Sequence, residues 1–89
     1  MDELVEGPSV LKEIASEYEL QRRKFGVATH PYLTWCSILQ EKLGGISRSA
    51  LNCNFYRGSD SLLRKECIRM AVICIQMAEA VDSNNANGE

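Results

Sequence analysis

The segment from Ile68 to Ala78 limits the possible folds of this chain more than any other part of it. On a helical wheel its side chains are apolar on nearly every side, with Arg69 and Gln76 as the interruptions. A helix of that kind must be covered on several sides. Two other short helices of the same chain provide too little cover, so we expect a homo-oligomer, a dimer or a tetramer, with this helix in its core.

Two earlier segments also show helical periodicity. Apolar side chains recur at steps of three and four residues between Pro8 and Gly26, and these two residues suit the first turn and the end of a helix. A second helix is expected after Pro31, because proline disfavours helix at the residue before it. Its register continues to about Phe55 across Gly44-Gly45, so we expect one continuous helix, although each glycine costs about 1 kcal/mol there.

The chain is therefore expected to be all-α. The third helix should run from about Leu62 to Val81, after a turn at residues 57–60. With 89 residues there is room for one domain, residues 8–81, between an acidic N-terminal tail at residues 1–7 and a polar, disordered tail at residues 82–89. No apolar run approaches the roughly 20 residues that span a membrane, so we expect no membrane partner.

Charge is distributed unevenly along the chain. The net charge is −2, yet five of the twelve acidic residues lie in the two tails, while all ten lysines and arginines lie between Pro8 and Val81. The small positive excess of this central part suits an anionic small molecule. It is too small to indicate binding of duplex nucleic acid.

The cysteines and the N-terminus bear on location. The four cysteines form no CxxC pair and the chain has one histidine, His30, which argues against zinc and fits a reducing cytosol. Because the N-terminus lacks an apolar signal core, we expect a cytoplasmic protein. We expect His30, followed by Pro31, to brace a turn rather than to act as an acid or base.

Segments of all three expected helices resemble motif blocks of one family, in the same order. Residues 17–26 read EYELQRRKFG and resemble the ER-x-x-Q-x-x-K-W-G box of phage-encoded MazG-like nucleotide pyrophosphohydrolases. His30, Trp35 and Ile38-Leu39 fall where that pattern has H, W and I-L, and residues 64–72, RKECIRMAV, resemble its R-x-E-L-x-x-V-A-A-V block. The resemblance covers about Ile14 to Val81 and implies a MazG-like helical bundle.

The resemblance also implies a metal site that this chain has largely lost. In active members, the acids of an ExxE pair and of a later ExxD pair bind Mg²⁺ ions, which hold the triphosphate and activate water. Carried over by position, the ExxE residues are Lys42 and Gly45, and the ExxD residues are Glu66 and Arg69. A single carboxylate holds Mg²⁺ poorly, because the ion prefers an octahedral shell of oxygen ligands. We therefore expect no cofactor.

Binding without turnover is the function that we favour on this basis. Lys42 and Arg69 stand where the family holds metal, and both cations can contact phosphate directly. Arg22, Arg23 and Lys24 would extend the basic lining, and Trp35, Phe55 or Tyr56 could stack on a base. The expected ligand is a phosphorylated nucleotide or a cyclic-nucleotide immune signal. The resemblance to phage proteins implies sequestration of that ligand in the host cytoplasm, as an anti-defence protein.

Three other interpretations stay open. An active Mg²⁺-dependent pyrophosphohydrolase would need a new metal cage, built from acids among Glu17, Glu19, Glu41 and Glu66, although acids on helix faces are more often solvated. Alternatively, Lys42 and Arg69 pair with Glu41, Glu66 or Glu79 and merely fill an inactive site. The third interpretation is a protein-binding module that inhibits a host enzyme.

Overall fold

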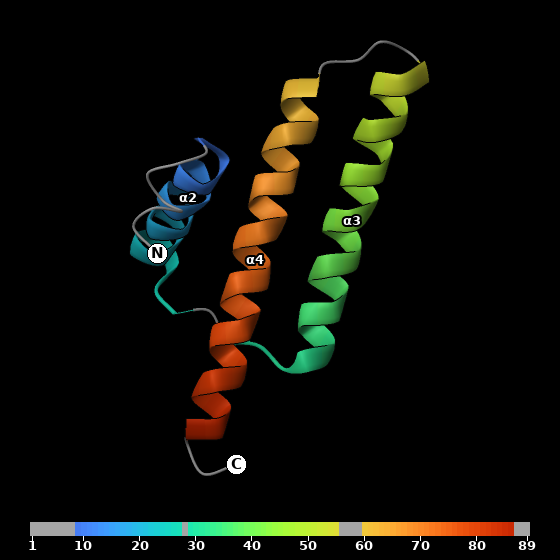
Figure 1. Ribbon diagram of the computed structural model, residues 1–89. Helices are drawn as coiled ribbons and strands as arrows, with labels where there is room; N and C mark the ends of the chain where they lie inside the picture. The colour runs from blue at the N-terminus through green and yellow to red at the C-terminus, as the bar shows by residue number, and fades with distance from the viewer. Residues whose placement is uncertain (1–8, 28, 56–59, 87–89) are drawn as a thin grey trace.

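The computed structural model describes residues 9–27, 29–55 and 60–86. Within these ranges the chain forms α2 (Ser9–Phe25), α3 (Tyr32–Phe55) and α4 (Asp60–Ala86), and no strand. The expected all-α fold is confirmed. Figure 1 shows α4 between α2 and α3, with α3 and α4 running in opposite directions, and α4 packs against both of the other helices.

Local backbone geometry sets the end of α2 and the start of α3. At Gly26 the φ angle is +70°, a left-handed conformation that glycine adopts without steric penalty, and its N–H donates to the Arg22 carbonyl at 2.9 Å. The carbonyl of Pro31 accepts bonds from the N–H groups of Thr34 and Trp35, at 3.0 and 3.2 Å. The predicted end of the first helix and start of the second are therefore confirmed.

Helix α3 is continuous through Gly44-Gly45, as its register predicted. The C-terminal boundary differs from the prediction, because α4 continues past Val81 to Ala86, so the tail expected to begin at Asp82 is helical that far. Between Val81 and Gly88 the sequence has no proline or glycine that would end the helix. In addition, Asn84 Nδ2 donates a hydrogen bond to Tyr32 Oη at 3.2 Å. The predicted tail at residues 1–7 and the turn at residues 57–59 lie outside the described residues.

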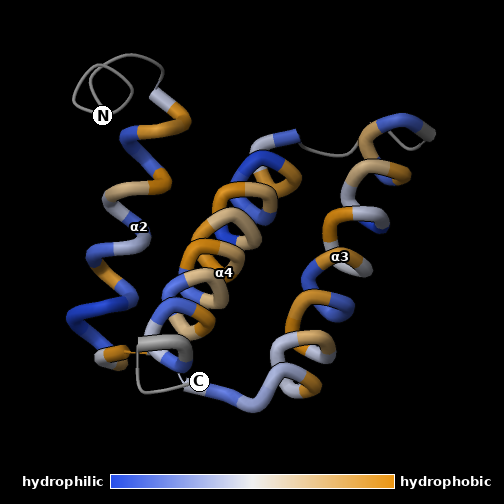
Figure 2. Tube along the Cα trace, turned by 60° about the horizontal axis from the view of Figure 1, so that its bottom comes forward, coloured by the Kyte–Doolittle hydropathy of each residue, from blue (hydrophilic) through white to orange (hydrophobic). Residues whose placement is uncertain are grey.

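The core of the described part is small. Trp35 of α3 is 1% exposed, and Ile68, Val72 and Ala80 of α4 are buried with it. Large apolar side chains remain exposed on all three helices. Figure 2 shows hydrophobic positions spread along the length of α3 and α4. The most exposed of them are Leu33 at 82% and Phe25 at 73%. None of the helices in the described ranges is both long and apolar enough to cross a lipid bilayer.

Candidate functional site

A pocket of about 220 Å³ lies where the three helices converge. It brings together Lys42 from α3 and Arg69 from α4, the two cations at positions that the sequence resemblance assigns to metal ligands. Glu17 and Gln21 of α2 line the opposite side, and Gln21 Nε2 donates to Glu17 Oε2 at 2.6 Å. The remaining lining residues come from α4 and are Val72, Ile73 and Gln76. The pocket therefore combines charged and amide side chains with an aliphatic surface.

Lys42 and Arg69 are exposed, and neither makes a hydrogen bond or ion pair with another residue of the described ranges. The expected alternative, in which they pair with Glu41, Glu66 or Glu79, is not found there. Glu66 and Glu79 have other partners, described below. The two cations consequently keep their full hydrogen-bonding capacity for an anion.

A larger pocket of about 600 Å³ adjoins the first, and Glu17 and Arg69 line both. It lies between α2 and α4. Arg64 Nη1 and Nη2 donate to Glu13 Oε2 and Oε1 across it, at 2.5 and 2.9 Å. These bonds lower the pKa of Glu13 and raise that of Arg64, because each favours the charged form of its partner. Lys65 lines the same pocket without such a partner in the described ranges.

Glu66, the one acid at the four positions that the sequence resemblance assigns to metal ligands, joins α3 to α4. Ser49 Oγ donates to Glu66 Oε1, and Ser49 is itself buried. A Cβ atom on Gly45 would lie 2.7 Å from Glu66 Oε2, so the absent side chain at Gly45 makes room for the carboxylate. Glu66 is not among the residues that line either pocket. This contact is not predicted by the sequence pattern, although Gly45 and Ser49 are small residues four apart on one helix face.

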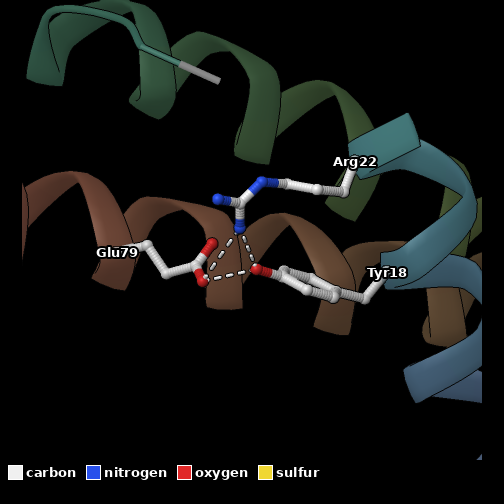
Figure 3. A network of polar contacts seen from close by, with 3 residues as sticks. All are labelled: Tyr18, Arg22 and Glu79. Carbon is white, nitrogen blue, oxygen red and sulfur yellow. Dashed lines mark hydrogen bonds and ion pairs between the residues drawn. The ribbon is translucent and has the colours of Figure 1, made fainter. Parts of the chain in front are cut away.

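A second contact ties α2 to α4 (Figure 3). Tyr18 Oη donates to Glu79 Oε2 at 2.5 Å and accepts a bond from Arg22 Nη1 at 2.6 Å, and that nitrogen lies 3.7 Å from the same Glu79 oxygen. The bond to Glu79 raises the pKa of Tyr18, since ionisation of the hydroxyl would remove the donor and oppose the carboxylate. Arg22 is thus engaged outside the two pockets, contrary to its expected place in their lining.

The other predicted residues are scattered. Arg23 lies on a separate hollow of α2, with Lys12 and Glu19, and Lys24 lines neither pocket. Trp35 is buried, with the His30 ring packed edge-on at a centroid distance of 4.8 Å, so it forms core and has no free face for a base. This contact agrees with a bracing role for His30. Tyr56 and the side chain of Phe55 lie outside the described residues.

The structure does not gather the carboxylates of the alternative metal cage. Glu17 accepts a hydrogen bond from Gln21, Glu66 accepts one from Ser49, and Glu41 is exposed on α3. Among the described residues no group of three or more His, Cys, Asp and Glu side chains could hold a metal ion. Comparisons with models of protein families, with curated proteins and with solved structures gave no match to this chain.

Proposed function

We propose that this chain captures a phosphorylated nucleotide, or a cyclic-nucleotide signal, and releases it unchanged. The observation that carries the proposal is the pair Lys42 and Arg69, two cations from different helices that line one pocket without a partner among the described residues. A phosphate between them would accept charge-assisted hydrogen bonds from an ammonium and a guanidinium. Arg69 suits this role because its planar donors match two phosphate oxygens at once.

Capture fits the chemistry of this pocket better than hydrolysis. Hydrolysis of a phosphoanhydride in this family depends on metal ions held by several carboxylates. Glu17 is the single carboxylate among the described residues that line the smaller pocket, and Gln21 donates to it. Lys42 and Arg69 would instead supply the positive charge to the phosphate directly. They neutralise the ligand without activating water.

We further propose that the fold is MazG-like and completed by a second copy of the chain. The support is the sequence resemblance together with the small core and the exposed leucines Leu33, Leu43 and Leu51 of α3. Burying an exposed leucine contributes about 1.5–3 kcal/mol, so several on one helix favour association. A protein of this kind, made in an infected cell, would lower the concentration of a defence signal by binding it.

The experiment combines affinity with recovery of the ligand. Nucleoside triphosphates and cyclic nucleotides are titrated into the protein by calorimetry with and without Mg²⁺, and bound ligand is identified by chromatography after denaturation. We expect intact ligand, and an affinity loss of about tenfold or more for Lys42→Gln and for Arg69→Gln. Lys12→Gln, an equal loss of charge at an exposed site on α2 outside both pockets, should bind as before. Pyrophosphate release that stops when a chelator is added would overturn the proposal.

A further inference from the structure

We infer that the preferred ligand carries two phosphate groups on opposite sides of a sugar. The inference rests on the proposed function and deepens it, because the pocket at Lys42 and Arg69 shares two lining residues, Glu17 and Arg69, with the larger pocket. We refer to the smaller pocket as the inner chamber and to the larger as the outer chamber.

The volumes of the two chambers indicate which part of the ligand each one can hold. The inner chamber, at about 220 Å³, is smaller than the roughly 300 Å³ at which ligand pockets usually begin. The outer chamber, at about 600 Å³, lies within the usual range. A nucleotide therefore fits with one phosphate in the inner chamber and its nucleoside in the outer one.

Cations line both chambers. Lys42 lines the inner chamber, Lys65 lines the outer chamber, and Arg69 lines both. Lys65 and Arg69 lie four residues apart on α4, which is about 6 Å along the helix axis and about one turn round it. One ribose can bridge a separation of that size between two phosphates. Lys65 is exposed and makes no hydrogen bond or ion pair in the described ranges, whereas its neighbour Arg64 is bound to Glu13.

Glu17, like Arg69, lines both chambers. Its carboxylate accepts hydrogen bonds, so a sugar hydroxyl is a suitable partner there. A continuous polyphosphate would instead put negative charge beside this carboxylate and be repelled. A carboxylate common to both chambers, with cations in each, thus suits a sugar hydroxyl that lies between two phosphates. Nucleoside bisphosphates and cyclic dinucleotides share this arrangement, and a triphosphate tail lacks it.

The test uses three probes that share one base: AMP, adenosine 3′,5′-bisphosphate and cyclic di-AMP. By calorimetry we expect either two-phosphate probe to bind about tenfold or more tightly than AMP. Whichever of the two binds more tightly identifies the ligand class as a nucleoside bisphosphate or a cyclic dinucleotide. Lys65→Gln should remove this gain, so that the two-phosphate probes no longer bind more tightly than AMP, and Lys12→Gln should leave the gain as it is in the wild type. Glu17→Gln should strengthen binding of inorganic tripolyphosphate, which has no sugar.

The outcomes separate the two proposals. Equal affinity for AMP and both two-phosphate probes, unaltered by Lys65→Gln, would overturn the inference and leave nucleotide capture intact. If no probe binds, and the wider panel of nucleotides does not bind either, both proposals fail. Circular dichroism of each variant shows that the fold is retained, which is expected because Lys65 and Lys12 are exposed.

Discussion

The carboxylate of Glu66 occupies the space that a side chain at Gly45 would fill, with Oε2 only 2.7 Å from the position of a Cβ atom. Ser49, one turn further along α3, holds the other carboxylate oxygen. These contacts join α3 to α4 at a level where the resemblance implies metal ligands. The acid to which the resemblance assigns a metal therefore has a structural role in this chain.

Alanine substitutions at the two adjacent glycines should have different effects. Gly44→Ala should stabilise the protein by about 0.5–1 kcal/mol, because alanine favours helix and its Cβ would meet only the mobile end of Arg48, at 3.4 Å. Gly45→Ala should give no gain, since the same benefit is offset when Glu66 moves and its bond to Ser49 is lost. Urea denaturation of both variants measures the difference. Equal stabilisation by both would contradict the contact.

Removal of the hydroxyl at Ser49 should destabilise the protein by about 1–2 kcal/mol, because a partly buried carboxylate then lacks its donor. Ser47→Ala, on an exposed position of the same helix, should stay within about 0.5 kcal/mol of the wild type. A double-mutant cycle of Ser49→Ala with Glu66→Gln should give a coupling energy of about 1 kcal/mol. Strict additivity would mean that the two side chains do not interact.

Alkaline pH should weaken the link between α2 and α4. The pKa of Tyr18 is raised above 10.0 by its bond to Glu79, so the stabilisation is complete below pH 10 and is lost as the pH rises through the folded-state pKa. NMR of ring-labelled tyrosine should show Tyr18 ionising at a higher pH than free tyrosine does. In Tyr18→Phe the decline in stability above pH 10 should be shallower than in the wild type. Identical pH profiles for the two proteins would rule out the contact.

The exposed leucines of α3 should control assembly. We expect the wild-type protein to elute with the mass of a dimer or tetramer in light-scattering chromatography, and Leu43→Glu to shift it toward one chain, because a buried charge without a partner is costly. Asn52→Glu adds the same charge on another side of the helix and should leave the mass unchanged. A wild-type protein that is monomeric at high concentration would refute the proposed association.

The sequence predicts helix boundaries correctly where a glycine or proline restricts the backbone conformation. Gly26 and Pro31 mark ends that the structure confirms, and α3 crosses Gly44-Gly45 because its apolar register is unbroken. The end of α4 was misjudged, because polarity after Val81 indicated a tail although no residue there interrupts a helix before Gly88. Low hydrophobicity predicts exposure better than it predicts loss of helix.

The contacts between helices could be predicted only in part. Lys42 and Arg69 were paired through the family resemblance, and they do line one pocket. The run Arg22-Arg23-Lys24 was expected to act as one basic patch, yet successive residues of a helix point about 100° apart, so the three separate. Arg22 reaches Glu79 because of how α2 crosses α4, and the sequence pattern of α2 alone does not predict that crossing.

Helix α4 is the only helix of the described part that contacts both of the others, since α2 and α3 pack on it and not on each other. The α3–α4 hairpin can therefore stay folded while α2 opens, breaking mainly the surface contacts at Tyr18 and Glu13. A ligand bound between α2 and α4 would oppose that opening. Amide hydrogen exchange in α2 should therefore slow when the ligand is bound, while the exchange rate in α3 should hardly change.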